Sequence, residues 1–170
     1  MERLILMRHG QAERPAPGLE DFDRALDAEG RAESRLMGRV MAEAGLTPDL
    51  ALVSPAKRAI ETWRVAAEAF PDPIDVQEDR SLYAASAARL AAAAELVGPR
   101  GRSLIIVGHN PGIHQYAVHL ARQGGAEDGE VGLLYDRFPT GSIVVFRMSR
   151  KGKPKFDRLL LVKDHRDWAK

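Results

Sequence analysis

The chain contains no cysteine, and this absence excludes several kinds of chemistry. Disulfides, thiolate metal sites and a cysteine nucleophile all require a thiol. A long hydrophobic run near the start is missing as well, because only four apolar residues, Leu4–Met7, stand between two arginines. That run is too short for the apolar core of a signal peptide or for a membrane-spanning helix. We therefore expect a cytoplasmic protein that has no membrane partner.

Neither sign of charge dominates the sequence. Lysine and arginine total 25 while aspartate and glutamate total 24, which gives a formal net charge of +1. A broad basic field, of the kind that binds nucleic acid or an anionic membrane, is therefore not expected, and any anion must bind locally. The 170 residues, of which 45% are hydrophobic, fit a single domain over residues 1–170 with a substantial core.

Short apolar runs alternate with segments of helical periodicity. The runs that predict strands are Leu4–Met7, Leu50–Val53 and Leu104–Val107, and Ile74–Gln77 fits a further short strand. Helices are expected over 27–44, 55–70, 86–97 and 112–123, with a surface loop over 11–23 and an acidic, glycine-rich connection over 124–132. A hairpin of Ser142–Met148 and Phe156–Val162 follows. The pattern predicts a three-layer α/β/α fold, with a mainly parallel sheet and an antiparallel edge hairpin near the C-terminus.

Side chains suited to binding an anion follow three of the predicted strands. Arg8 and His9 come directly after the first strand. Ser54 and Arg58 follow the second strand, Leu50–Val53, and His109 follows the strand Leu104–Val107. Because the carboxyl ends of parallel strands lie at one edge of a sheet, we expect these side chains to converge there. Guanidinium forks beside imidazoles suit a phosphate-like anion.

Some of these residues, and Gly10 after His9, also have a purely structural explanation. Arg58 fits a solvated helix charge, which is the usual state of an arginine. His109 fits a histidine that caps a helix or packs in the core, and Gly10 fits an ordinary turn residue. The functional interpretation therefore depends on the convergence of the strand ends.

Five segments of the chain resemble the histidine phosphatase superfamily, which includes cofactor-dependent phosphoglycerate mutases and acid phosphatases. The segments are Leu-Met-Arg-His-Gly at 6–10, Asp23, Arg24 and Leu26 followed by Gly30, Val-Ser-Pro-Ala-Lys-Arg-Ala at 53–59 with Thr62, Val-Gly-His-Asn-Pro at 107–111, and Pro-Thr-Gly-Ser at 139–142. The short length and the Gly-His-Asn-Pro turn are most similar to the SixA-like branch. This resemblance implies a phosphohistidine phosphatase without a lid subdomain.

The residues in these segments are chemically suited to phosphoryl transfer. Arg8 and Arg58 are expected to clamp the phosphoryl group, because their guanidinium groups keep their charge in a desolvated pocket. His9 is expected to attack as a neutral imidazole, which the adjacent guanidinium charges favour, with its other ring nitrogen bonded to a backbone carbonyl. His109 is expected to donate to the phosphoryl oxygens and to stabilise the transition state.

Further residues are expected at the phosphate. Gly10, Ser54 and Asn110 are predicted to contact it. Arg24 occupies a position where SixA-like proteins carry arginine, which implies a third positive group at the rim of the pocket. Its structural alternative is an ion pair with Asp21 or Asp23. Thr62 is expected to pack on its helix.

The sequence shows no clear acid for the leaving group. Larger superfamily members use a carboxylate after the second arginine, and Glu78 and Asp79 lie in that region without a matching motif. Solvated loop charges are the more usual state of such residues. Because a phosphohistidine leaves through an easily protonated nitrogen, the missing acid favours a phosphoramidate substrate. We expect an open pocket that accepts a phosphohistidine-bearing protein as its partner.

Two other functions remain open at this point. One is a phosphatase for a small metabolite that uses the same His9 chemistry, and the other is a non-catalytic module that senses phosphate. No cofactor and no metal are expected, because His109, His114 and His119 point around their helix and no His-Glu-x-x-His motif occurs. A monomer or a weak dimer is predicted, and residues 163–170 receive no role.

Overall fold

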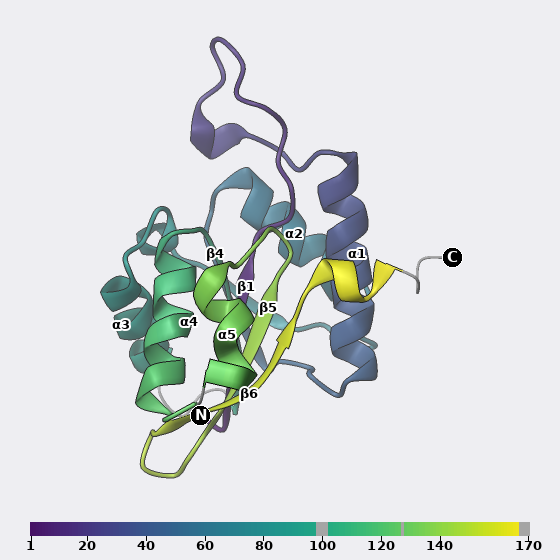
Figure 1. Ribbon diagram of the computed structural model, residues 1–170. Coiled ribbons are helices and arrows are strands. Elements are labelled where there is room, and N and C mark those ends of the chain that lie inside the picture. Colours follow the sequence, from purple (N-terminus) through teal and green to yellow (C-terminus); the bar gives the residue numbers. More distant parts are fainter. Residues whose placement is uncertain (98–101, 127, 167–170) are drawn as a thin grey trace.

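A computed structural model describes residues 1–97, 102–126 and 128–166 and contains a six-stranded sheet in the order β3-β2-β4-β1-β5-β6. The strands are β1 (Arg3–Arg8), β2 (Leu50–Val53), β3 (Asp75–Glu78), β4 (Ser103–Gly108), β5 (Ile143–Met148) and β6 (Pro154–Leu160). β1 to β4 run parallel to one another, while β5 pairs antiparallel with β1 and with β6 (Figure 1). The predicted mainly parallel sheet with an antiparallel edge hairpin is confirmed.

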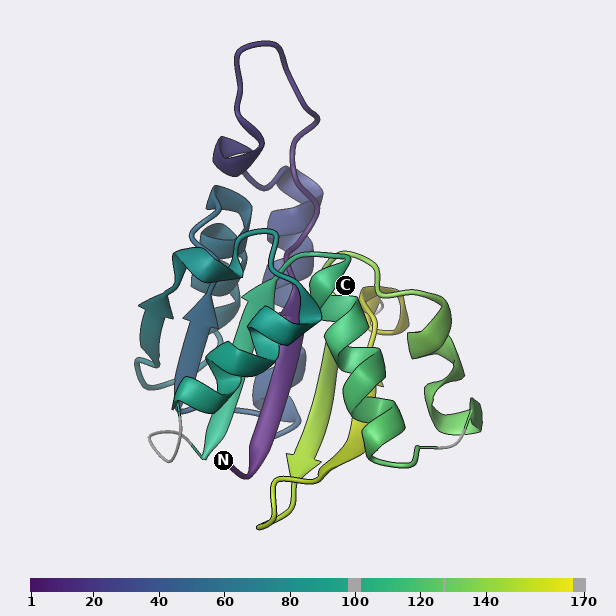
Figure 2. The ribbon, with the colours of Figure 1, turned by 90° about the vertical axis from the view of Figure 1, so that its left-hand side faces the viewer.

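Helices cover both faces of this sheet (Figure 2). α1 (Ala28–Glu43) and α2 (Lys57–Ala67) lie on one face. α3 (Ala87–Val97), α4 (Gly112–Gln123) and α5 (Asp128–Asp136) lie on the other. Side chains along β1 alternate between the two hydrophobic cores, with Leu4 and Leu6 in one core and Ile5 and Met7 in the other. Four consecutive apolar residues therefore form a strand that is buried on both faces, and the three-layer prediction is confirmed.

One helix was not expected. Residues 124–132 were predicted as a connection, but α5 begins at Asp128. Its glycines, Gly129 and Gly132, lower intrinsic helix propensity by roughly 1 kcal/mol each. Burial of Val131 and Leu134 in the core outweighs that cost. Tertiary packing thus overrides the local sequence signal, and the prediction for this segment was wrong.

An exposed arm, residues 13–24, projects beyond the carboxyl ends of the parallel strands (Figures 1 and 2). An isolated antiparallel bridge between Ala12 and Leu26 closes its base. A short 3-10 helix, η1 (Asp21–Asp23), forms the returning half of the arm. The sequence predicted a surface loop here, and the arm is that loop.

The remaining described segments are short. Between β3 and α3 the chain forms the 3-10 helix η2 (Arg80–Leu82), and after β6 it forms η4 (Val162–Asp164). Trp168 and the rest of residues 167–170 lie outside the described residues. No helix in the described part of the chain is long and apolar enough to cross a membrane.

Candidate active site

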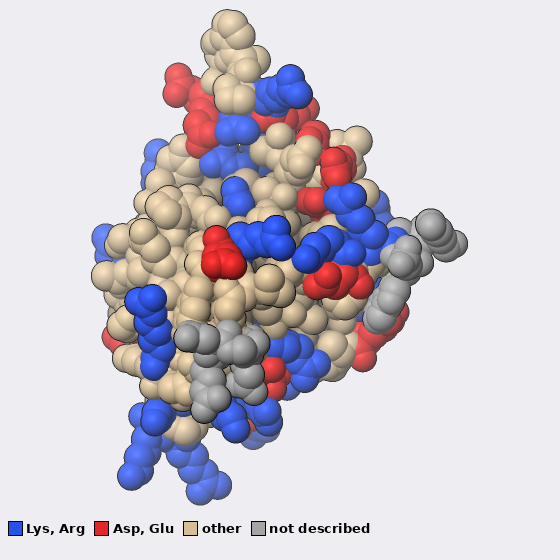
Figure 3. All heavy atoms as spheres, viewed as in Figure 1, with Lys and Arg blue, Asp and Glu red and all other residues tan. Residues whose placement is uncertain are grey.

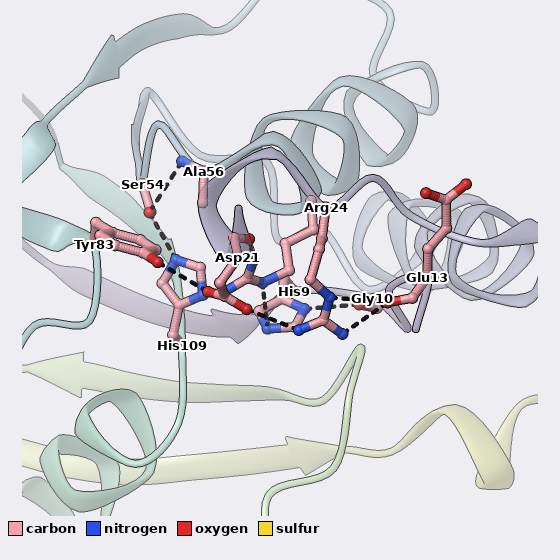
Figure 4. Close-up of polar contacts among 10 residues, drawn as sticks. His9, Gly10, Glu13, Asp21, Arg24, Ser54, Ala56, Tyr83 and His109 are labelled. Carbon is pink, nitrogen blue, oxygen red and sulfur yellow. Dashed lines mark hydrogen bonds and ion pairs between the residues drawn. The ribbon is translucent and has the colours of Figure 1, made fainter. Parts of the chain in front are cut away.

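The carboxyl ends of β1, β2 and β4 lie side by side. Arg8 pairs with Gly108, and Val53 pairs with Val107, so the residues that follow each strand begin at the same level. The structure brings the ring centroids of His9 and His109 to 5.1 Å (Figure 4). Two imidazoles separated by a hundred residues in sequence therefore share one site.

A backbone contact fixes the orientation and the tautomer of His9. Its Nδ1 lies 2.7 Å from the carbonyl oxygen of Gly10, and only a protonated Nδ1 makes a hydrogen bond to a carbonyl. Nε2 then carries the lone pair, which accepts a hydrogen bond of 3.3 Å from Nε of Arg58. Nε2 is thus free of a proton, which is the state that attack on phosphorus requires.

Burial is the main reason that His9 is neutral. The pKa of His9 is lowered to about 3, mainly by desolvation, with smaller decreases from His109, Arg58 and Arg8, while the hydrogen bond to Gly10 acts in the opposite direction. The neighbouring guanidinium groups, which were expected to keep the imidazole neutral, lower its pKa less than burial does.

Gly10 is required for packing against α1. A Cβ at this position would lie 2.7 Å from the carbonyl oxygen of Gly30 and 2.9 Å from the hydroxyl of Ser34. The amide of Gly10 donates to Oγ1 of Thr62 (2.9 Å), and this hydroxyl donates to the carbonyl oxygen of Arg58 (2.6 Å). Thr62, expected only to pack on its helix, therefore connects α2 to the residue that follows His9.

Ser54 contacts the Nε2 atom of His109. Oγ of Ser54 lies 2.7 Å from Nε2 of His109 and also accepts a longer hydrogen bond (3.4 Å) from the amide of Ala56. Nδ1 of His109 is buried and has no protein partner. The pKa of His109 is lowered to about 4, mainly by burial and to a smaller extent by Arg58 and Arg8, whereas Asp21 acts to raise it. The Ser54 hydroxyl can donate to Nε2, which leaves an Nδ1–H group for an anion.

Arg8 and Asn110 both bind the segment that leads into β5. Nη1 of Arg8 and Nδ2 of Asn110 donate to the carbonyl oxygen of Phe138, at 3.0 and 2.9 Å. Nε of Arg8 remains buried without a protein partner, as does Oδ1 of Asn110. Arg8 thus keeps a donor for phosphate. Asn110 uses one of the two N–H groups of its amide on Phe138, and its contact with phosphate stays a prediction.

Arg24 lies in the arm. Its Nη1 pairs with Oδ1 of Asp21 (2.8 Å), while its Nε and Nη2 donate to the carbonyl oxygen of Glu13 (Figure 4). The structural alternative, an ion pair with Asp21, describes this arrangement. Arg24 therefore stabilises the arm, and the structure shows none of its donors directed at His9.

Two carboxylates near the site were not identified from the sequence. Asp21 binds Arg58 directly, with 2.9 Å between Oδ2 and Nη2. Glu33 is buried in α1, where desolvation raises its pKa, and its Oε2 accepts a hydrogen bond of 3.3 Å from the amide of Gln11. For Asp21, the only signal in the sequence was its spacing from Arg24, with which it could form an ion pair.

Neither of the acids that the sequence analysis considered contacts the two histidines. Glu78 is exposed on β3. Oδ1 of Asp79 accepts a hydrogen bond from the amide of Ser81 at the start of η2. In the described part of the chain, no three histidine, aspartate or glutamate side chains are grouped so that they could hold a metal ion.

Comparison with known proteins agrees with this geometry. The model of the histidine phosphatase superfamily (branch 1) matches residues 4–83. The uncharacterized protein Rv1276c of Mycobacterium tuberculosis is 30% identical over 143 residues, which are 84% of this chain and 87% of that protein. The 2,3-bisphosphoglycerate-dependent phosphoglycerate mutase of Thermobifida fusca is 43% identical over 70 residues, which are 40% of this chain and only 28% of the mutase.

Solved structures share nearly the whole fold. A protein from Agrobacterium tumefaciens assigned as the phosphohistidine phosphatase SixA superimposes with a TM-score of 0.82 at 28% identity, covering 94% of this chain and 98% of that one. The protein histidine phosphatase SixA complexed with tungstate gives 0.78 at 22% identity, covering 95% and 98%. With the arginines and histidines of the site in place, these matches show that the chain belongs to the histidine phosphatase superfamily.

Proposed function

We propose that this protein is a phosphohistidine phosphatase that forms a covalent intermediate on His9. The observation that carries the proposal is the fixed tautomer of His9, whose unprotonated Nε2 faces the site beside Arg58. The unpartnered Nδ1 of His109 and the unpartnered Nε of Arg8 complete the set of donors available to a phosphoryl group. These donors are positioned before any substrate arrives, which is the arrangement that stabilises a charged transition state.

The reaction proceeds in two transfers. Nε2 of His9 attacks phosphorus, and the bond between phosphorus and the substrate nitrogen breaks as the new bond forms. The departing imidazole takes a proton from solvent. Water then attacks the phosphorus on His9 as the bond to Nε2 breaks and Nε2 regains its lone pair. One proton of the water passes to solvent, and the other stays on the oxygen of the inorganic phosphate that leaves. Arg8, Arg58 and His109 stabilise the negative oxygens in both steps.

Two observations favour a phosphoramidate over an alkyl phosphate ester. Glu78 is exposed on β3 and Asp79 accepts a hydrogen bond from the amide of Ser81, so neither carboxyl group is held at the two histidines to serve as an acid for an alkoxide leaving group. The similarity to the Agrobacterium tumefaciens protein assigned as the phosphohistidine phosphatase SixA supports the same class of substrate. We further propose a phosphohistidine-bearing protein as the partner, and a cytoplasmic reaction that needs no metal.

A substrate comparison tests this proposal. The protein is assayed with a phosphohistidine peptide and with a panel of alkyl phosphate esters, including small metabolites, in the presence of a chelator. We expect hydrolysis of the peptide to be at least about tenfold more efficient, and we expect it to be lost in His9→Ala.

Other results would contradict the proposal. Preference for a metabolite ester would show a small-molecule phosphatase. Tight phosphate binding without turnover of any substrate would show a sensing module. Inhibition by the chelator would contradict metal independence.

A further inference from the structure

The carboxylate of Asp21 reaches from the arm to Arg58 in the site. Nη2 of Arg58 lies 2.9 Å from Oδ2 of Asp21, and its Nη1 donates to the backbone carbonyl oxygen of the same residue. One residue thus occupies both terminal nitrogens of the guanidinium group. The Arg58 side chain is 7% exposed, whereas that of Asp21 is 51% exposed, so the pair lies at the mouth of the site.

The geometry of a guanidinium group gives this contact a directional effect. A guanidinium presents one pair of N–H groups at its terminal edge and another along the edge that contains Nε. Asp21 binds the terminal edge of Arg58, while Nε of Arg58 points at Nε2 of His9. The edge that contains Nε is therefore directed to the place where a phosphoryl group on His9 would stand.

Asp21 also contacts the half of the site that contains His109. The hydroxyl of Tyr83 donates to Oδ2 of Asp21 at 2.9 Å. The ring of Tyr83 lies edge-on to that of His109, with centroids 5.7 Å apart, and edge-on to that of Phe22 at 5.1 Å. One carboxylate therefore connects the arm and Arg58 with the ring that borders His109. Figure 4 shows Asp21, Tyr83 and His109 in this arrangement.

We propose that Asp21 is a positioning residue for phosphoryl transfer, which holds the terminal edge of Arg58 so that the edge containing Nε faces the phosphoryl group on His9. This inference rests on the proposed function, because it assigns Asp21 a part in the same transfer. It gives the arm a role in the reaction, since the arm supplies the carboxylate.

The rival interpretation is that Asp21 is an internal anion that competes with the phosphoryl group for Arg58. The two interpretations predict opposite effects when the carboxylate is removed. If Asp21 competes with the phosphoryl group, its removal should make an anion bind more tightly. The loss of a negative charge near the site predicts the same effect. Positioning predicts weaker binding and slower transfer, because Arg58 is free to turn away from His9.

The experiment compares Asp21→Asn and Asp21→Ala with Asp23→Asn. Asp23 is a matched control because it lies in the same 3-10 helix, is exposed, and has no side-chain hydrogen bond or ion pair that the described residues show. Binding of inorganic phosphate is measured by calorimetry, and kcat and KM are measured separately on the phosphohistidine peptide. Circular dichroism melting verifies that each variant is folded.

We expect both Asp21 variants to bind phosphate about tenfold more weakly and to lower kcat about tenfold to a hundredfold, with a smaller change in KM. Asp23→Asn should remain within about twofold of the unchanged protein. Asp21→Glu, which keeps the charge on a longer side chain, should recover part of the lost kcat. Equal or tighter phosphate binding in Asp21→Asn, or equal losses in Asp23→Asn, would overturn the inference.

The two readouts separate this inference from the proposed function. Phosphate binding requires no turnover, so an unchanged protein that binds phosphate but hydrolyses nothing would contradict the proposed function and still allow the effect of Asp21 on phosphate to be measured. An unchanged protein that shows no phosphate binding would contradict the anion site itself, and the inference with it.

Discussion

His9 owes its neutral state to burial, and its orientation to the backbone. The ring lies against Gly10 and Arg58 at the end of β1, where water has little access. Which residues converge at this point was predictable, because strand ends and residue types are visible in the sequence. The hydrogen-bond partners of these residues were not predictable, because Asp21 and Thr62 reach the site through contacts between segments that are distant in sequence.

The stability of the protein should decrease in mild acid because of the two buried histidines. Their pKa values in the fold, about 3 for His9 and about 4 for His109, lie below the ordinary value of 6.5. Between these limits the unfolded chain binds protons that the folded protein does not, so stability is full above about pH 6.5 and is lost as the pH falls. We expect Tm to fall between about pH 7 and about pH 4.

Variants show whether the histidines of the site cause this loss. His9→Ala should make Tm less dependent on pH. His119→Ala, which changes an exposed histidine on α4, should leave the slope unchanged. A slope that is the same in all three proteins would contradict the explanation.

Arg58 should not be replaceable by lysine. Lysine keeps the positive charge, but it cannot bind Asp21 and face His9 at the same time, because it has no planar fork. We expect Arg58→Lys to lower kcat/KM about a hundredfold. Arg64→Lys makes the same change at an exposed position of α2 and serves as the control. Near-normal activity in Arg58→Lys would remove the guanidinium group from the mechanism.

At the scale of elements, α1 and α2 fix the residues that follow β1. The N-terminal turn of α1 packs on the backbone at Gln11, and α2 reaches Gly10 through Thr62. The boundaries of both helices agreed with the sequence pattern to within a few residues. α5 was missed because its stability comes from the burial of Val131 and Leu134 and not from local propensity.

Substitutions at two glycines test the packing of α1 beside the site and the helix propensity of α5. A Cβ on Gly30 would lie 2.0 Å from the carbonyl oxygen of Gln11, so Gly30→Ala must displace the backbone beside the site. We expect a loss of about 1–3 kcal/mol in the free energy of unfolding, together with reduced activity. Gly132→Ala has open space around its Cβ within α5 and should stabilise the protein by about 0.5–1 kcal/mol. Denaturant unfolding measures both, and similar stabilities for the two variants would contradict this account.

At the scale of the whole molecule, the sheet order brings the site together. β2, β4 and β1 are adjacent and parallel, so three carboxyl ends meet at one edge, with the arm beyond them. On the face drawn in Figure 3, basic and acidic side chains are interspersed, apart from a group of basic ones at its lower end. This distribution agrees with the net charge of +1 and with an anion site that depends on local donors.

The most direct test of the central claim is to identify the phosphorylated residue during turnover. The protein is mixed with phosphoramidate, quenched in base, and analysed by mass spectrometry of its peptides. The account predicts phosphate on His9, formed within one turnover and absent from His9→Ala. Turnover by the unchanged protein with no phosphate on His9, or the same labelled peptide in His9→Ala, would contradict it.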